Sequence, residues 1–447
     1  MLTSKYSRIS IFLHILLFLT VASSALTYWK AADYAIHGHW LPEYYKDQSY
    51  IAIVPSWQKL VKDGLAFLLL LGSLFWPATN PVYKYQKNNN IKVAYILLLF
   101  VISISLARSI LTNFSLSILF FTTRPLIITA AIFIFCHRHL NNHYLIKVLE
   151  FTNILAISQV FYAVMQRMTA VNYNSVSWFS SGIVRSVGTF TEPNSLGLFL
   201  VICAYFNIYI LKWHPWRIAL LAAYALAIFL SDSRTSILIL FLLFTEKIFY
   251  HLTRFCKTQI DFLFLNFTRF AILPFLAFYA ILAVKDLSIR GANSSLYGGR
   301  LEIFLAYVNQ SDIFSVLFGK HLGFGSNTLK ILQDSNILEG SDAALADSTW
   351  SYILFQFGIL GILLVIQILY LLFKDPIIHL NLQKDFQVHR ILVSQKMAIG
   401  IYLFCCLATI IIFEFYAVLP LLVCSLFFIQ YQYYYYILFV QQQADRN

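Results

Sequence analysis

The chain has 447 residues, of which 60% are apolar and only 12% are charged, and its mean hydropathy is +0.71. Because a soluble domain is about one quarter charged, this composition excludes an ordinary soluble protein and predicts a chain embedded mostly in lipid. The formal charge of +12 could indicate a nucleic-acid partner, but the Lys and Arg residues lie in short breaks between apolar runs. We therefore expect no nucleic acid and interpret the charge as topology signals and contacts with membrane lipids.

The predicted fold class is an all-α polytopic membrane protein. A membrane span needs about 20 mainly apolar residues, and this rule predicts about twelve transmembrane helices. Their ranges are 10–28, 59–77, 92–108, 114–136, 148–166, 194–211, 217–231, 236–250, 268–284, 348–373, 397–413 and 417–440. The first range lacks an Ala-x-Ala cleavage site, which favours a retained first span over a cleaved signal peptide. Arg124 and Pro125 interrupt the fourth range.

Basic residues in the short loops predict the orientation, because Lys and Arg resist translocation. The loop lysines and arginines that share one side are Lys84, Lys87, Lys92, Arg138, Lys147, Lys212, Arg217, Lys247, Arg254, Lys257, Lys374, Lys384, Arg390 and Lys396. That side is predicted to be cytoplasmic, and both termini fall on it. Three hydrophilic segments, 29–58, 167–193 and 285–347, then face outward.

The segment 285–347 is the largest of the three and is rich in Gly, Ser, Asn and Asp. Such a composition is typical of a structured surface loop or a small external subdomain. The predicted organisation is therefore helices 1–9 with short loops over 1–284, the large external loop over 285–347, and helices 10–12 over 348–447. No repeat relates the two halves, which weighs against transporters built from symmetric halves.

The cysteines predict no structural disulfide, and the histidines predict no metal site. The six cysteines fall within apolar runs or beside basic loops that we place in the cytoplasm. His137, His139 and His143 form a cytoplasmic patch without a nearby carboxylate or thiol at ligand spacing, so we interpret them as lipid-headgroup contacts. We expect no metal and no cofactor. A Walker-type loop is missing from the sequence, which argues against ATP-driven transport.

Four arginines lie on the outer side, against the positive-inside rule: Arg185, Arg234, Arg290 and Arg300. A single arginine at the membrane boundary is most often a snorkelling anchor. Four of them in segments rich in Gly, Ser and Asn favour a shared anionic ligand. Guanidinium binds phosphate through two hydrogen bonds and stays charged, so the cluster is suited to a pyrophosphate.

Glu192 is the first candidate for a proton acceptor, because it follows Arg185 and precedes a proline at the expected start of the sixth span. Asn194 and Ser195 beside it are either site residues or helix caps, and the sequence favours neither. Glu192 is either a first-turn carboxylate favoured by the helix dipole or a catalytic base.

The large loop supplies two further candidates. His321 lies in a glycine-rich turn and could accept a proton near neutral pH, or could simply be solvated. Asp347, where the loop enters the tenth helix, either caps that helix or orients an acceptor hydroxyl. Glu414, between the last two spans, is either a site residue or the partner of an outer arginine.

The order of these motifs resembles the O-antigen polymerase and O-antigen ligase superfamily. The resemblance covers about residues 180–365 and rests on short motifs in a fixed order. They are Arg185-Ser-Val-Gly-Thr-Phe-Thr-Glu192-Pro-Asn-Ser-Leu-Gly197, Ser231-Asp-Ser-Arg234-Thr, Gly299-Arg300, Gly323-Phe-Gly325, and Asp347-Ser-Thr-Trp-Ser-Tyr352 followed by Gly358-Ile-Leu-Gly361. The twelve predicted spans, with the largest external loop late in the chain, fit the remainder.

The resemblance implies a metal-independent glycosyltransferase in the bacterial inner membrane that uses undecaprenyl-pyrophosphate-linked oligosaccharide on the periplasmic face. Arg185, Arg234 and Arg300 would hold the pyrophosphate, and Arg290 is the fourth outer arginine. Positive charge there would stabilise the leaving group as the glycosyl bond breaks. Glu192 and Asp347, ahead of His321, would accept the proton of the attacking hydroxyl. A chain-length regulator protein would be a partner.

The resemblance leaves alternatives open. The ligase branch carries a His-Asn type motif where the large loop enters the next helix, whereas this chain has Asp347-Ser348 there. This departure favours the polymerase (Wzy-type) branch over a ligase that transfers polymer to lipid A core. A flippase or another transporter of lipid-linked oligosaccharide would use twelve spans equally well, but its ionisable residues should lie near the bilayer midplane. A membrane scaffold whose large loop binds a partner is the non-enzymatic alternative.

Overall fold

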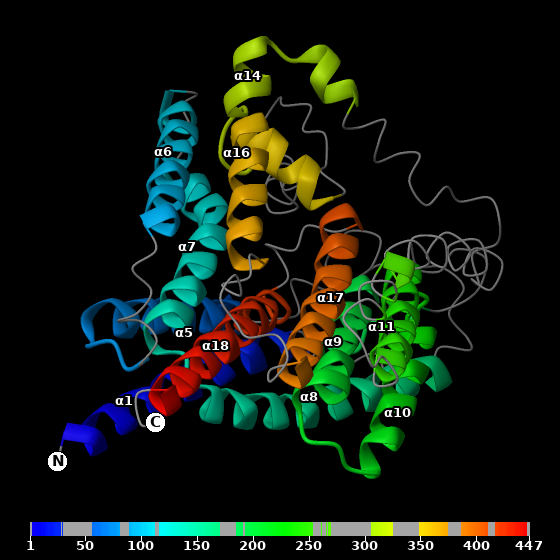
Figure 1. Cartoon of the computed structure of the whole chain (residues 1–447). Coiled ribbons are helices and arrows are strands. Elements are labelled where there is room, and N and C mark those ends of the chain that lie inside the picture. Colours follow the sequence, from blue (N-terminus) through cyan, green and yellow to red (C-terminus); the bar gives the residue numbers. More distant parts are fainter. Residues whose placement is uncertain are drawn as a thin grey trace.

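The computed structural model (Figure 1) describes most of the helical part of the chain. The described residues are 2–27, 29, 56–80, 89–111, 116–169, 185–190, 193–253, 261, 265, 267–269, 305–324, 348–373, 386–409 and 416–444. Within these ranges every regular element is a helix, which confirms the all-α prediction for the described part of the chain.

Eleven of the twelve predicted spans coincide with helices. The elements are α1 (Leu2–Ala25), α5 (Ser56–Phe75), α6 (Asn89–Leu111), α7 (Leu116–His139), α8 (Asn142–Thr169), α9 (Pro193–Tyr205) with the π-helix η4 (Phe206–Ile210), α10 (Trp216–Leu230), α11 (Arg234–Leu252), α14 (Ile313–Phe318), α16 (Thr349–Phe373), α17 (Phe386–Thr409) and α18 (Leu419–Ala444). The predicted span 268–284 lies outside the described residues except for its first two positions.

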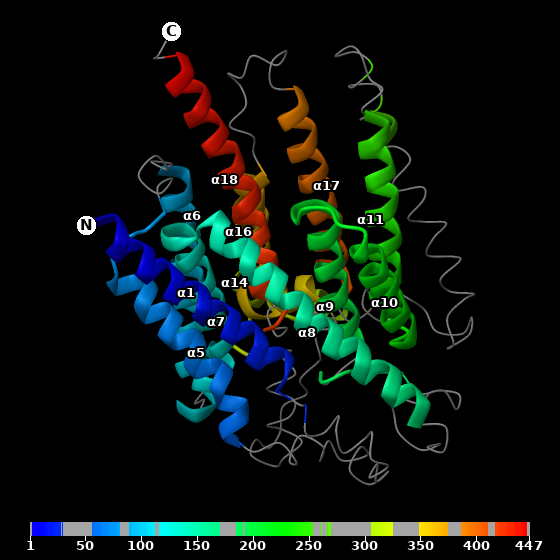
Figure 2. The ribbon, with the colours of Figure 1, turned by 90° about the horizontal axis from the view of Figure 1, so that it is seen from below.

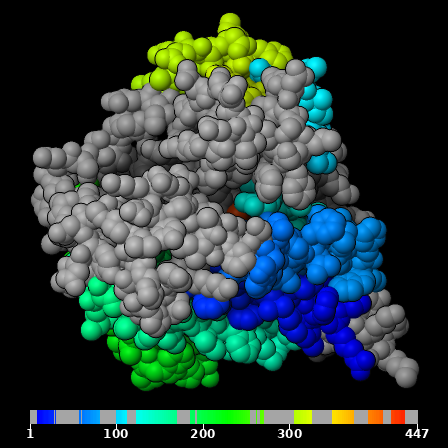
Figure 3. Space-filling model, turned by 180° about the vertical axis from the view of Figure 1, so that it is seen from behind, coloured from blue at the N-terminus to red at the C-terminus, as the bar shows by residue number. Residues whose placement is uncertain are grey.

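Five of the described helices are long and apolar enough to cross a membrane: α1, α8, α9 with η4, α11 and α16. Their outward faces carry large apolar side chains; on α1, for example, Phe12 and Ile15 are 48% and 50% exposed. Figure 3 shows α1 and α5 side by side on one surface of the molecule. Apolar faces of this extent suit contact with acyl chains and mark a membrane-embedded protein. The number of twelve spans and their orientation stay predictions.

The helix α9 forms the centre of the bundle. All of its residues except Asn194 are buried, and α8, α10, α11 and α17 pack around it. Figure 2 shows α9 between α17, α11 and α10, with α8 and α1 crossing the bundle diagonally. The hydroxyl of Tyr402 on α17 donates a hydrogen bond to the Leu198 carbonyl of α9, at 3.0 Å. A helix that is apolar on all sides is expected at such a central position.

Buried polar side chains join the helices around α9. The Asn207 amide of η4 donates to Asn153 of α8 at 2.8 Å, and the Tyr224 hydroxyl of α10 donates to the same Asn153 oxygen at 3.0 Å. Glu246 of α11 forms an ion pair with Arg269 and accepts a hydrogen bond from Ser394 of α17. Because lipid offers no hydrogen-bond partner, such groups in a membrane protein must be satisfied by one another.

Two apolar helices depart from regular geometry, and a third contains a proline. The helix α7 continues through Pro125, so the predicted interruption there does not end it. The last turn of α9 widens into the π-helix η4, whose i to i+5 bond runs from the Leu211 N–H to the Phe206 carbonyl at 2.8 Å. The helix α16 breaks at Gly358, which has a φ of 68°. A π-segment or a break in an apolar helix is often found at a functional site.

The expected cytoplasmic histidine patch needs a correction. His139 is fully buried, and its ring bonds to the Ser73 carbonyl at the end of α5. The neighbouring Arg138 donates to the carbonyls of Leu74 and Trp76. Carbonyls at a helix C-terminus lack intrahelical partners and carry partial negative charge, so cationic side chains are favoured there. Arg138 therefore binds the end of α5 as a cation, His139 binds the same end through a hydrogen bond, and the interpretation of His139 as a headgroup contact is wrong.

Candidate functional site

The structure describes three of the seven predicted site residues: Arg185, Arg234 and His321. Glu192, Asp347, Arg290 and Arg300 lie outside the described residues, as does Glu414. Arg185 and Arg234, 49 positions apart in sequence, come together where α8 ends and where α9 and α11 begin. His321 belongs to a separate group, because its neighbours Lys320 and Leu322 bond to Phe355 of α16 and Ser109 of α6. Figure 1 shows α6 and α16 away from α9 and α11.

The segment 185–190 before α9 is fixed by two glutamines of α8. The side-chain oxygen of Gln166 accepts the N–H groups of Val187 and Gly188 at 3.0 and 2.9 Å, and its nitrogen donates to the Gly188 carbonyl at 2.7 Å. Gln159 bonds in the same way to the backbone and side chain of Thr189. Gly188 has a φ of 60°, a conformation that glycine adopts without strain. The two glutamines therefore replace the hydrogen bonds that a helix would supply.

Arg185 ties this segment to the turn between α10 and α11. Its side chain is 8% exposed, and its guanidinium donates to the carbonyls of Ser231 and Asp232 at 3.0 and 3.1 Å. The next residue, Ser186, donates its N–H to the Leu230 carbonyl. These carbonyls end α10, where a cation is favoured. Arg185 thus positions the turn between α10 and α11, and its positive charge lies beside the start of α11.

The turn 231–233 is tight and buried. Asp232 has a φ of 48°, a left-handed conformation that costs about 1–3 kcal/mol outside glycine. Asp232 is 4% exposed, and its Oδ2 atom has no hydrogen-bond partner among the described residues. Arg234 follows as the first residue of α11 and is partly exposed. Asp232 lies within the motif Ser231–Thr235 but was not predicted to be a site residue.

Two helix N-termini meet at this place. A methyl group at Gly197 of α9 would lie 2.8 Å from the Ser236 Cβ atom of α11, so only glycine permits this approach. The helix α9 begins at Pro193, a residue suited to a first turn. Asn194 and Ser195 therefore lie inside the first turn, and the interpretation of either as the cap before the helix is wrong. Two helix N-termini and two arginines, against the one described carboxylate of Asp232, leave this place with net positive charge, which favours an anion.

His321 lies in a second cationic group, where the segment 319–324 packs on the break in α16. The Arg108 guanidinium of α6 donates to the Gly319 carbonyl, and the Lys320 N–H donates to the Phe355 carbonyl at 2.8 Å. Gly319 packs closely on the backbone of Gln356 and Phe357, and Gly358 packs on the backbone of Leu317 and Phe318. The described part of the large loop therefore packs against α6 and α16, and Arg108 escaped sequence reasoning because it lies within an apolar run.

The environment of His321 favours its neutral form. Burial lowers the pKa of His321, the charges of Lys320 and Arg108 lower it further, and the hydrogen bond to the Leu322 carbonyl raises it. An imidazole with a lowered pKa is neutral at pH 7 and can accept a proton. Asp347 was expected to cap the following helix or to orient a hydroxyl. Ser348 fills the capping position of α16, because its Oγ atom accepts the Ser351 N–H at 3.2 Å.

A third cationic group lies between α5 and α7. Arg124 forms an ion pair with Asp63 at 3.4 Å and donates to the Tyr416 hydroxyl at 3.3 Å. The Lys62 ammonium lies 5.2 Å from the centre of the same Tyr416 ring. Sequence reasoning treated Arg124 only as an interruption of an apolar run. The signal that could have found this group is the presence of charged residues inside two predicted spans.

Comparisons with known proteins identify no family: no protein-family model, no curated protein and no solved structure matches the chain.

The substitution Gln166→Leu tests the anchoring of the segment 185–190. It removes the partners of two N–H groups and one carbonyl, and a buried group without a partner costs about 1–3 kcal/mol. We expect a clear fall in the apparent melting temperature of the purified protein in detergent. Lys147→Leu, at an exposed position of the same helix, is the control. Equal melting temperatures for the two variants would show that Gln166 does not anchor the segment.

The lowered pKa of His321 predicts a pH dependence of stability. A histidine that resists protonation when folded binds protons more readily in the unfolded state, so stability is present above its ordinary pKa of 6.5 and falls as the pH drops below that value. We expect His321→Gln to lose less stability than the wild type on acidification from about pH 7.5 to about pH 5. Thermal unfolding followed across this range measures the difference, and parallel curves would contradict a neutral, buried His321.

Proposed function

We propose that the chain polymerises O-antigen or a related surface polysaccharide at the periplasmic face of the bacterial inner membrane. In this proposal it transfers a growing glycan en bloc from undecaprenyl pyrophosphate to the non-reducing end of a second lipid-linked repeat unit. The observation that carries the proposal is the meeting of two arginine motifs with the N-termini of α9 and α11. The motif order that resembles the polymerase and ligase superfamily supports the same conclusion.

The leaving group in this reaction is a lipid pyrophosphate, which gains negative charge as the glycosyl bond breaks. Partly exposed Arg234 at the first turn of α11 is suited to bind a phosphate oxygen through its planar guanidinium. Buried Arg185 acts through its charge and by holding the turn in place. Fixed donors and dipoles of this kind stabilise developing charge because they need not reorient during the reaction. Arg290 and Arg300 would add further positive charge.

The attacking sugar hydroxyl must lose a proton, and a carboxylate or a neutral imidazole can accept it. Glu192, Asp347 and His321 are the proposed acceptors, as the motif order suggests. Asp232, whose backbone carbonyl binds Arg185 and which precedes Arg234 by two residues, adds a carboxylate and is a fourth acceptor to consider. Of these four, only Asp232 is both described and part of the Arg185–Arg234 group.

Deletion of the gene in its own host, followed by complementation, tests the proposal. We expect the deletion strain to carry lipid A core with a single repeat unit, because attachment continues while polymerisation stops. Wild type and Lys212→Ala, an exposed lysine at the other end of the bundle, should restore the polysaccharide ladder on a gel. Arg234→Ala should not restore it, although the variant is present in the membrane at the wild-type level.

Two other outcomes would contradict the proposal. If the deletion strain lacks all attached glycan while long polymer remains on the carrier lipid, the protein is a ligase. If the deletion leaves the ladder unchanged, neither the polymerase nor the ligase activity belongs to this chain.

A further inference from the structure

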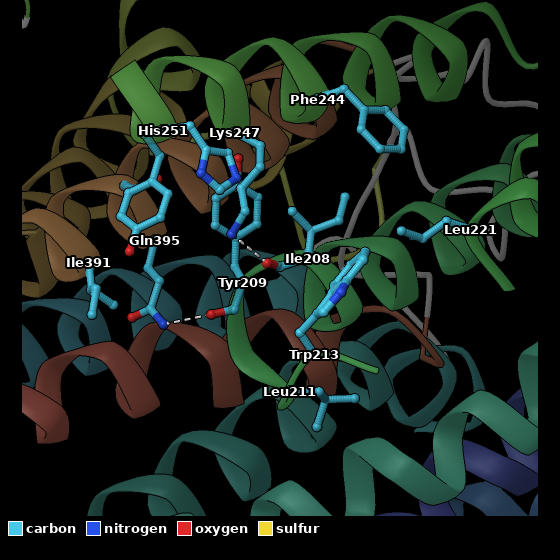
Figure 4. Close-up of a pocket in the computed structure, with 12 residues that line it drawn as sticks. Ile208, Tyr209, Leu211, Trp213, Leu221, Phe244, Lys247, His251, Ile391 and Gln395 are labelled. Carbon is cyan, nitrogen blue, oxygen red and sulfur yellow. Dashed lines mark hydrogen bonds between the residues drawn. The ribbon is translucent and has the colours of Figure 1, made fainter. Parts of the chain in front are cut away.

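A cavity of about 670 Å³ lies at the opposite end of the bundle from the arginine site. It is lined by residues of η4, α10, α11 and α17 and by the segment after η4, among them Tyr209, Trp213, Phe244, Lys247, His251 and Gln395 (Figure 4). Trp213 and Phe244 are 56% and 40% exposed, so the cavity reaches the surface of the protein. Its volume suits a small-molecule ligand or part of a lipid.

The π-helix η4 shapes the inner wall of this cavity. The Ile208 carbonyl accepts a hydrogen bond from the Lys247 ammonium, and the Tyr209 carbonyl accepts one from the Gln395 side-chain nitrogen, each at 2.9 Å. Figure 4 shows Lys247 and Gln395 reaching the π-helix from two different helices. Widened helix turns of this kind recur at ligand sites. The irregular turn thus places a cation and an amide on one side of an apolar cavity.

The polar part of the lining suits a phosphate-bearing headgroup. Lys247, with its ammonium 5.0 and 4.8 Å from the rings of Tyr209 and Tyr250, supplies positive charge, and His251 lies in the same wall. The Gln395 side chain belongs to a residue that is 3% exposed, and its Oε1 atom has no hydrogen-bond partner among the described residues. A buried acceptor without a partner costs about 1–3 kcal/mol, which a donor from a bound ligand would recover.

We propose that this cavity binds an anionic phospholipid whose headgroup carries a hydroxyl, as phosphatidylglycerol does. The phosphate would lie at Lys247, the headgroup hydroxyl would donate to the Gln395 Oε1 atom, and the acyl chains would cover Trp213 and Phe244. A choline headgroup has no donor for that oxygen. An ethanolamine headgroup would bring a second ammonium beside Lys247, which like-charge repulsion disfavours. The basic-residue pattern predicts that these helix ends face the cytoplasmic leaflet, where anionic lipids gather.

In the sequence, Lys247 is one of the basic residues that predict the cytoplasmic side. The structure gives it a second property, because its ammonium turns back to the π-helix and contacts two aromatic rings. This inference does not depend on the proposed polymerase activity, since the arginine site lies at the other ends of the same helices. A failure of either proposal leaves the other in place.

Quenching of Trp213 fluorescence by brominated lipids tests the proposal. The full-length protein is reconstituted into phosphatidylcholine vesicles that contain a minor fraction of one brominated lipid, and the Trp213→Phe variant isolates the contribution of Trp213. We expect brominated phosphatidylglycerol to quench this contribution several-fold more strongly than brominated phosphatidylcholine or phosphatidylethanolamine at the same fraction. Equal quenching by the three lipids would overturn the proposal, and a preference for phosphatidylethanolamine would also overturn it.

Two lysine variants separate the cavity from general surface charge. Lys247→Met should reduce the ratio of phosphatidylglycerol to phosphatidylcholine quenching to near one, Lys247→Arg should keep it, and Lys147→Met should leave it unchanged. All three must match the wild type in melting temperature and in elution from a sizing column. If Lys147→Met lowers the ratio as much as Lys247→Met, the preference comes from surface charge and the cavity site is wrong.

A lipid analogue tests the role of Gln395 without changing the protein. Phosphatidylmethanol has the same charge as phosphatidylglycerol but no hydroxyl to donate. We expect brominated phosphatidylmethanol to quench Trp213 less strongly than brominated phosphatidylglycerol. Equal quenching by these two anionic lipids would overturn the assignment of the headgroup hydroxyl to the Gln395 Oε1 atom.

Discussion

Backbone that is not helical but lies among membrane helices must find its hydrogen bonds within the protein, because lipid supplies none. This constraint explains the arrangement of the described structure. At the segment 185–190, Gln159 and Gln166 of α8 receive and donate the bonds that a helix would have formed. At the break in α16, the Lys320 N–H and the Ser105 hydroxyl bind the carbonyls of Phe355 and Gln356. In each case side chains or backbone from other elements supply the hydrogen bonds that a regular helix would have formed.

The same constraint connects structure to chemistry. A segment whose backbone is fully bonded keeps a fixed shape, so the groups it carries do not have to reorganise when a charged ligand binds. The segment 185–190 holds Arg185 against the end of α10, and the turn that follows places Arg234 on the first residue of α11. The close approach at Gly197 brings the start of α9 beside it. The proposed pyrophosphate site therefore consists of positions that the surrounding helices already determine.

Sequence reasoning found most of the helices because long apolar runs are a local signal, and eleven of the twelve predicted spans coincide with described helices. Their irregularities were not predictable. Nothing in the run around Phe206 distinguishes a π-turn from a regular one, and the break at Gly358 packs on the backbone of Leu317 and Phe318, which lie about 40 positions away in sequence. Pro125, a strong local signal, does not end its helix.

The candidate site was predictable in part. The motifs that carry Arg185 and Arg234 were recognisable in order, and their meeting is consistent with a shared role. The segment that carries Arg185 is held by Gln159 and Gln166. These glutamines were not predicted to matter, because they look like ordinary polar residues within an apolar span. His139 shows the reverse error, because a histidine beside basic residues suggested lipid headgroups while its true partner is the end of α5. Such partners are distant in sequence, and one sequence holds no signal for them.

Photo-crosslinking along α11 tests the central claim that the arginine end of the bundle binds the lipid-linked glycan. A photoreactive amino acid replaces either Thr235, beside Arg234, or Ile248, which is 61% exposed near the other end of the same helix. The account predicts that light attaches undecaprenyl-pyrophosphate-linked oligosaccharide to the variant at position 235 and that Arg234→Ala abolishes this product. Attachment at position 248 with none at position 235, in membranes that still make polymer, would contradict it.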